Sequence, residues 1–278
     1  MPACSRHFVF QESGMKICSI ASSSSGNSIY VGTDSTHILI DSGISGKRLK
    51  AGLDVIGIDP SEIDAVLITH EHSDHIKGLG VVSRRYGIPI YATERTWSKI
   101  QTSGLTGNID EGLFHEIVPD TDFFINDVII HPFNSFHDAV QPVCYTFRKG
   151  GKKISVATDL GCYNSYIADK IKDSDLLFIE ANHDIDMLKK GSYPYYLKKR
   201  ILSDTGHLSN EMSARLISEV MHENLRYVVL GHLSKENNIP ELARETVLSG
   251  VSSCCASLPQ CTEFIVSEKE SVSPLIEI

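Results

Sequence analysis

The stretch LITHEHSDH (67–75) decides how the rest of the chain is interpreted. It places three histidines and an aspartate within six residues, directly after the apolar run AVLIT (65–69). Short runs rich in β-branched residues are typical of buried strands. Imidazoles together with a carboxylate suit Zn, Mn or Fe. The stretch therefore predicts a metal site at the end of a strand.

The spacing within this stretch places its candidate ligands on two sides of the chain. In extended chain His70 and His72 point the same way, and Asp74 continues that alternation. His75 falls on the other side, where the chain turns into a helix. One short segment would thus offer ligands to two neighbouring points in space. The alternative is a polar surface cluster in which Asp74 caps the helix.

Composition excludes several classes of protein. The 278 residues are 41% hydrophobic and carry a formal net charge of −9, which argues against a general polyanion binder but not against a local basic surface. No apolar run is long enough to span a membrane, and the start lacks the apolar core of a secretory signal. The seven cysteines form no CxxC pair. Reduced thiols and a cytoplasmic location are expected.

Strand and helix patterns run through most of the chain. Residues 1–14 are predicted to be a poorly ordered N-terminal extension and residues 15–278 a single domain of mixed sheets, with the oligomeric state left open. Strands are expected at 16–20, 37–41, 65–69, 88–92, 127–133, 143–148, 153–158, 175–181 and 226–232, and helices at 45–57, 75–86, 193–204 and 209–225.

The motif HxHxDH after a strand resembles the signature of the metallo-β-lactamase-fold family, and the resemblance covers most of the chain from Met15. It implies an α/β fold, a four-layer αββα sandwich with two mixed β-sheets. It also implies three later ligands at strand ends, which His137 in NSFHDAVQ, Asp159 in SVATDLG and His232 in VVLGHLS would fill.

The resemblance further implies how two divalent metal ions would be held. His70, His72 and His137 would bind one ion. Asp74, His75 and His232 would bind the other, and Asp159 would bridge them. With an aspartate at the bridge, a pair of similar hard metals such as Mn or Zn, or else Fe, is favoured. Two such ions can share a hydroxide nucleophile, which Asp74 would orient for hydrolysis.

Two stretches favour a nucleic-acid substrate. The serine-rich turn at 20–31, with Ser25 and Asn27, could cradle an anion through its backbone N–H groups, or be only a flexible hairpin loop. The segment 184–210 interleaves cations and tyrosines, which suits single-stranded nucleic acid, although a solvated helix face has the same pattern. Its candidate contacts are Tyr195, Lys198, Lys199 and Arg200.

The motifs SSSSGNS, THEHSDH, FHDA, TDLG, EANHD, GHLSN and GHLSKENN, in this order, resemble the YycJ (WalJ) group of bacterial metallo-hydrolases. This implies a nuclease that acts on single-stranded or 5′-ended DNA, as a 5′–3′ exonuclease. His183 and His207 are candidates to donate a proton to the leaving oxygen or to bind phosphate, with structural support as the alternative. The competing function is a thioester or lactone hydrolase of the glyoxalase-like type.

Overall fold

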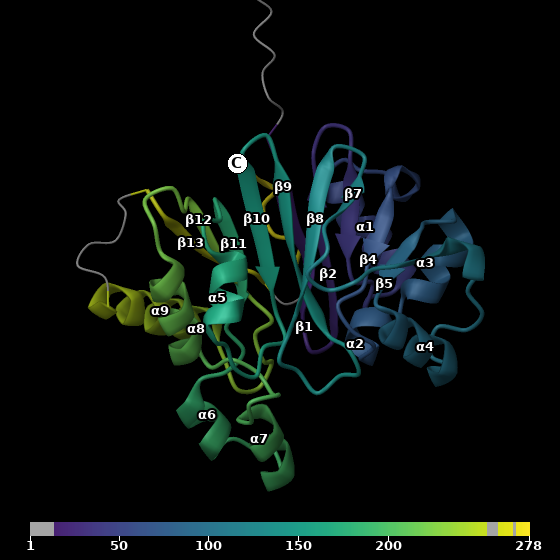
Figure 1. The fold of residues 1–278 in the computed structure, drawn as a ribbon. Coiled ribbons are helices and arrows are strands. Elements are labelled where there is room, and N and C mark those ends of the chain that lie inside the picture. Colours follow the sequence, from purple (N-terminus) through teal and green to yellow (C-terminus); the bar gives the residue numbers. More distant parts are fainter. Residues whose placement is uncertain (1–13, 255–260, 269–270) are drawn as a thin grey trace, which may run out of the picture.

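The structure is a computed structural model that describes residues 14–254, 261–268 and 271–278. The predicted N-terminal extension lies outside the described residues, except for Gly14. Two seven-stranded sheets pack face to face, with helices on both outer sides (Figure 1). Sheet 1 has the strand order β14 (Ile276–Glu277), β1 (Lys16–Ser23), β2 (Gly26–Gly32), β3 (His37–Ile40), β4 (Ala65–Leu67), β5 (Ile90–Ala92) and β6 (Phe114–Glu116).

Sheet 2 also contains seven strands. Its strand order is β13 (Glu263–Val266), β12 (Tyr227–Gly231), β11 (Leu176–Glu180), β10 (Lys152–Ala157), β9 (Val143–Lys149), β8 (Val128–Asn134) and β7 (Phe123–Ile125). In each sheet an antiparallel part precedes a parallel part, which runs from β3 to β6 in sheet 1 and from β10 to β13 in sheet 2. The predicted α/β class with two mixed sheets is confirmed.

Both faces of the central strands are buried. On β11, Leu176 and Phe178 pack into the core between the sheets, whereas Leu177 and Ile179 pack under the helices of sheet 2. A strand covered on both faces needs apolar side chains at every position, which explains the unbroken run LLFI. The same burial on both faces in sheet 1 produces the four layers.

The helices that cover each sheet belong to separate cores. Sheet 1 is covered by α1 (Gly46–Val55), α3 (Leu79–Tyr86) and α4 (Glu94–Ser103), and sheet 2 by α5 (Ser165–Ile171), α8 (Asn210–Val220) and α9 (Pro240–Cys254). The short elements are α2 (Ser73–Ile76), α6 (Ile185–Lys190), α7 (Tyr195–Ile201) and the 3-10 turns η1 (Pro60–Glu62) and η2 (Glu111–Leu113). Helices α6 and α7 project below the sandwich (Figure 1).

Two local expectations are wrong in detail. Strand β4 ends at Leu67 and Ser73–Ile76 is a helix, so Asp74 does not continue an extended alternation. The helix expected at 75–86 is divided into α2 and α3 near Gly78. A Cβ on Gly78 would lie 1.8 Å from the carbonyl oxygen of Ile44, so this close backbone approach requires glycine.

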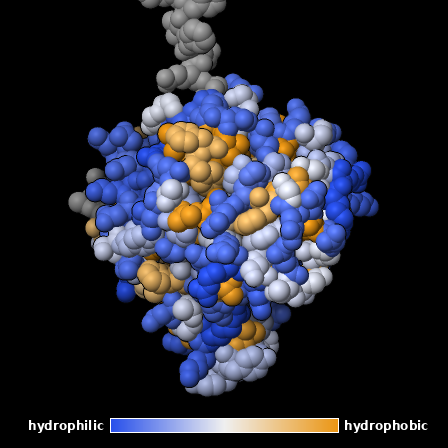
Figure 2. Space-filling view, turned by 45° about the vertical axis from the view of Figure 1, so that its right-hand side comes forward, coloured by the Kyte–Doolittle hydropathy of each residue, from blue (hydrophilic) through white to orange (hydrophobic). Residues whose placement is uncertain are grey.

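The face of the molecule seen in Figure 2 is mainly hydrophilic. Figure 2 shows hydrophobic residues on one face in separate small patches rather than in one continuous area. None of the helices in the described part of the chain has the length and apolarity needed to cross a bilayer.

Candidate metal centre

Residues that follow strands of both sheets meet at one edge of the sandwich. Asp159 follows β10 and His232 follows β12, and both have left-handed backbone angles, with φ of 57° and 56°. Asp41, directly after β3, has φ 61°. Non-glycine residues in this region carry strain that clusters at functional sites. Three of the six non-glycine residues with positive φ in the described part of the chain therefore lie at this edge.

Three imidazoles face one another here. The Nε2 atom of His70 lies 3.0 Å from Nδ1 of His72, and Nε2 of His137 lies 3.3 Å from the same atom. His70 is fully buried, and burial together with the neighbouring His75 holds its pKa well below the usual value. Neutral rings with converging nitrogens are the donor set that borderline metal ions prefer.

Hydrogen bonds on the far side of two of these rings fix which nitrogen faces the centre. Nδ1 of His137 donates to the carbonyl oxygen of Gly206 at 3.0 Å. Nδ1 of His70 lies 3.0 Å from Oγ1 of Thr69, which itself donates to Asp41 and therefore accepts from the ring. In neutral rings the Nε2 lone pairs of His70 and His137 are then directed at the centre.

The second group combines Asp74, His75 and His232, each of which offers a ligand atom within 4.8 Å of the other two. Asp74 and His75 come from the first turn of α2. Nε2 of His75 lies 3.6 Å from Oδ2 of Asp74. The side-chain amide of Asn27 lies 3.0 Å from the same nitrogen, beneath the group.

Asp159 lies between the two groups. Its Oδ1 is 3.7 Å from Nε2 of His137 and 3.6 Å from Nε2 of His232, and its Oδ2 is 3.5 Å from Nε2 of His75. Burial opposes ionisation of this carboxyl, yet His232 and His75 hold its pKa well below the usual value. The chain thus places a buried carboxylate where both groups can share it.

Two buried atoms of this centre lack hydrogen-bond partners, namely Oδ2 of Asp159 and Nε2 of His232. Unpaired buried polar atoms are costly unless something else satisfies them. Carboxylate oxygens and imidazole nitrogens are common ligands of divalent metal ions. The residues present therefore fit a divalent cation.

Asp41 is a site residue that the sequence reasoning missed. Its Oδ2 accepts from Nδ1 of His75 at 2.7 Å, and its carboxylate also accepts from the backbone and hydroxyl of Thr69. Burial opposes protonation of His75, but Asp41 and Asp159 raise its pKa to about 10. The signal was present in ILIDSG, where an aspartate directly follows a strand as Asp159 does.

Glu180 connects the second group to His207. Its Oε1 accepts from Nδ1 of His207 at 2.7 Å and from Nδ1 of His232 at 2.9 Å. Its Oε2 accepts from the backbone N–H groups of Leu160 and Leu208. Burial alone would raise the pKa of Glu180, but His207 and His232 lower it to about 2. Glu180 is thus a buried anion that orients two rings.

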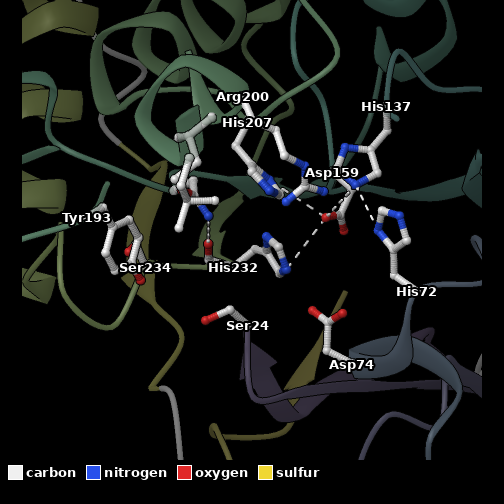
Figure 3. Close-up of a pocket in the computed structure, with 13 residues that line it drawn as sticks. Ser24, His72, Asp74, His137, Asp159, Tyr193, Arg200, His207, His232 and Ser234 are labelled. Carbon is white, nitrogen blue, oxygen red and sulfur yellow. Dashed lines mark hydrogen bonds and ion pairs between the residues drawn. The ribbon is translucent and has the colours of Figure 1, made fainter. Parts of the chain in front are cut away.

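A cavity of about 260 Å³ opens over this centre (Figure 3). Figure 3 shows Ser24 and Asp74 on one side and His207 and Arg200 on the opposite side. The lining residues are Ser24, His72, Asp74, His137, Asp159, Asn182, Tyr193, Leu197, Arg200, Ile201, His207, His232 and Ser234.

Several predicted site residues lie outside this lining. His183 is buried, both of its ring nitrogens lack hydrogen-bond partners, and the neighbouring Asn182 lines the cavity instead. Burial lowers the pKa of His183 to about 4. Ser25 is exposed next to Ser24, and Asn27 lies under the ligands. The structure therefore brings His207 to the cavity but not His183, Ser25 or Asn27.

The candidate nucleic-acid contacts of segment 184–210 have different surroundings in the structure. Arg200 lines the cavity and forms a two-pronged ion pair with Asp138, in which Nη2 lies 2.8 Å from Oδ1 and Nε contacts Oδ2. Lys198 donates to the carbonyl oxygens of Lys189 and Gly191, so it braces α7 against α6. Lys199 and Tyr195 are exposed on α7.

Comparison with known proteins identifies relatives along almost the whole chain. Residues 36–232 match the family described as "Beta-lactamase superfamily domain". The exodeoxyribonuclease WalJ of Streptococcus pneumoniae serotype 2 (strain D39 / NCTC 7466) is 41% identical over 269 residues, which cover 96% of this chain and 99% of WalJ. The exodeoxyribonuclease YycJ of Bacillus anthracis is 40% identical over 235 residues, 84% of this chain and 88% of YycJ.

The fold has close structural neighbours at low sequence identity. The metallo-beta-lactamase fold protein YhfI from Bacillus subtilis superposes with a TM-score of 0.70 at 16% identity, covering 94% of this chain and 99% of YhfI. At this identity the similarity concerns the fold alone.

Proposed function

This chain belongs to the beta-lactamase superfamily and, within it, to the family of the WalJ and YycJ exodeoxyribonucleases, and we propose that it is a metal-dependent exodeoxyribonuclease. The observation that carries the proposal is the place of Asp159, a buried carboxylate within 3.7 Å of histidine nitrogens from both ligand groups. We propose DNA as the substrate because both relatives are named exodeoxyribonucleases.

We propose that the centre holds two divalent ions, Mn or Zn, with Fe also suited to the ligands. His70, His72 and His137 would bind the first, Asp74, His75 and His232 the second, and Asp159 both. Bound cations would activate water for attack and neutralise charge on the phosphate. Asp74, which lines the cavity, would also orient the attacking water.

His207 is our candidate for the residue that protonates the leaving oxygen. Glu180 accepts from its Nδ1, which leaves Nε2 as the nitrogen available to a substrate in the cavity. The hydrogen bond to Glu180 holds the ring in one orientation, which is what a proton donor to the leaving group needs. A catalytic role for His183 stays a prediction without support from its position.

Arg200 is our candidate for a phosphate contact. It stands in the wall of the cavity opposite Asp74, and a guanidinium binds phosphate oxygens through a planar set of donors. Lys199, Tyr195, Ser25 and Asn27 remain predicted contacts, and attack from the 5′ end is proposed from the subfamily motifs. The buried thiols of Cys18 and Cys144 are free, which suits the cytoplasm.

One experiment tests the function. Purified protein is assayed for bound metal and incubated with Mn²⁺ and a 5′-phosphorylated single strand labelled at its 3′ end. We expect labelled products that shorten in steps, abolished by chelator and by Asp74→Ala or Asp159→Ala, with Asp54→Ala, on the exposed face of α1, as the control. Hydrolysis of thioesters or lactones without action on DNA would contradict the proposal.

A further inference from the structure

One candidate ligand, His72, lacks a partner on the outer side of its ring. Its Nδ1 faces His70 and His137, so Nε2 is the nitrogen on the far side. In the described part of the chain, no acceptor lies within hydrogen-bond distance of this Nε2. The outer nitrogen of every other candidate ligand histidine has an acceptor, namely Thr69 for His70, Asp41 for His75, Gly206 for His137 and Glu180 for His232. The orientation of His72 is therefore the least supported in this centre.

The carboxylate of Asp138 lies beside the outer nitrogen of His72. Its Oδ1 is 4.0 Å from Nε2 of His72 and 3.4 Å from Nε2 of His137. An N–H···O hydrogen bond is about 2.9 Å long, so a movement of about 1 Å would join Asp138 to His72. The side chains of His72 and Asp138 are 30% and 31% exposed, which leaves room for this movement. Asp138 can thus supply the partner that His72 lacks.

The loop that carries Asp138 is held from two directions. The backbone N–H of Asp138 donates to the carbonyl oxygen of Thr205 at 3.1 Å, and Nη2 of Arg200 donates to its Oδ1 at 2.8 Å. The carboxylate of Glu71, inside the first ligand motif, accepts from the backbone N–H of Val140 at 3.0 Å. These contacts tie the loop both to that motif and to α7, so the place of Asp138 beside the centre is well determined.

We propose that Asp138 accepts a hydrogen bond from Nε2 of His72 in the metal-loaded protein and so acts as a positioning residue for the first ion. A carboxylate in this place fixes the orientation of a ligand histidine and raises the basicity of its metal-facing nitrogen. The inference rests on the proposed metal-dependent function and adds to it a residue that supports a ligand. The alternative is that Asp138 serves only as the counter-ion of Arg200.

Metal affinity tests this role without any nucleic acid. The metal-free protein is titrated with Mn²⁺ in a calorimeter, so that the two ions are measured separately. Asp138→Asn keeps the shape of the side chain but removes its charge. It should weaken the binding of one ion by about tenfold to a hundredfold, and that of the other ion much less.

Two further variants separate the explanations. Asp122→Asn is the matched control, because Asp122 also pairs with an arginine and a histidine, Arg148 and His131, and it should weaken neither ion. Arg200→Ala removes the other partner of Asp138. If Asp138 supports His72 directly, this variant should not weaken the binding of Mn²⁺.

NMR spectra of the histidine rings in the zinc-loaded protein test the bond itself. A hydrogen bond protects a ring proton from exchange with water, so the proton on Nε2 of His72 should be observed in the wild-type protein and lost in Asp138→Ala.

The inference would be overturned if Asp138→Asn weakened both ions equally or neither ion, if Asp122→Asn or Arg200→Ala weakened Mn²⁺ binding to the same extent, or if the ring proton persisted in Asp138→Ala. A wild-type protein that binds no divalent ion would instead refute the metal-dependent function itself.

Discussion

Asp41 and His75, 34 residues apart, meet through a 2.7 Å hydrogen bond from the ring Nδ1 to the carboxylate. Both side chains are buried. Carboxylates that hold a ligand histidine in this way fix its orientation and raise its basicity. Asp41 is thus placed to prepare His75 for a metal ion without reaching the cavity itself.

Asp41→Asn should weaken metal binding. Asparagine fits the left-handed backbone at this position, and its carbonyl can still accept from His75, but the negative charge is lost. We expect affinity for Mn²⁺ or Zn²⁺ to fall by about tenfold to a hundredfold. Competition with a chromogenic chelator measures it. Unchanged affinity would show that Asp41 only supports the loop.

Gly43→Ala should displace Asp74. A Cβ at Gly43 would lie 1.6 Å from the carbonyl oxygen of Asp74, so α2 would have to move. We expect loss of metal binding together with a lower melting temperature. Gly57→Ala is the matched control: its φ is +75° and its Cβ would meet open space, so it should cost about 1 kcal/mol of stability without affecting the metal. Equal metal binding in the two variants would contradict this.

His207→Ala should slow cleavage of DNA by about a hundredfold or more while the metal content stays unchanged. The reason is that the leaving sugar oxygen needs a proton, whereas a nitrophenolate does not. Hydrolysis of bis(p-nitrophenyl) phosphate by the same variant should therefore remain close to the wild-type rate. If both substrates are slowed equally, His207 binds phosphate rather than protonating the leaving group.

Asp127 should stabilise the fold in a pH-dependent way. It accepts from the hydroxyls of Ser35 and Thr36 and pairs with Lys149, which joins a turn of sheet 1 to sheet 2. Partial burial opposes its ionisation, yet Lys149 and the hydroxyls hold its pKa well below the usual value. The stabilisation is present above the unfolded pKa of about 3.9 and is lost as the pH falls below it.

Denaturant titration of Asp127→Asn measures this effect. The variant should be less stable than the wild-type protein at pH 7, and the difference should shrink steadily as the pH is lowered below about 4. A constant difference across this range would mean that the carboxylate charge is not involved.

Much of the fold was predictable because its strands are simple. Buried parallel strands such as β11 and β12 have continuous apolar sequences. The first ends at Glu180, and His232 directly follows the second. The small edge strands β6, β7 and β14 were not expected. They span two or three residues, which is too few to show the alternation of apolar and polar side chains that is typical of a strand. Only their pairing with a neighbouring strand defines them.

The site was predictable where its residues are clustered in sequence or follow a strand. His70, His72, Asp74 and His75 stand in one motif, and the structure brings His137, Asp159 and His232 to it. Residues that orient a ligand rather than bind the metal themselves, such as Asp41, are harder to recognise from the sequence.

Lys198 illustrates the limit. Its contact with a phosphate stays a prediction, and nothing in the sequence indicated that its Nζ donates to the carbonyl oxygens of Lys189 and Gly191. The sequence shows that a lysine is present at this position. Which acceptor its ammonium group contacts is determined by the tertiary structure. The same reason explains why the partners of Asp41 could not be foreseen.

The left-handed angles at Asp41, Asp159 and His232 have a consequence for how this protein can change. Glycine would relax the backbone at all three positions, yet it would remove the very groups that define the centre. Selection for robustness and selection for activity thus act in opposite directions at these strand ends. A thermostable lineage would have to gain its tolerance elsewhere in the molecule.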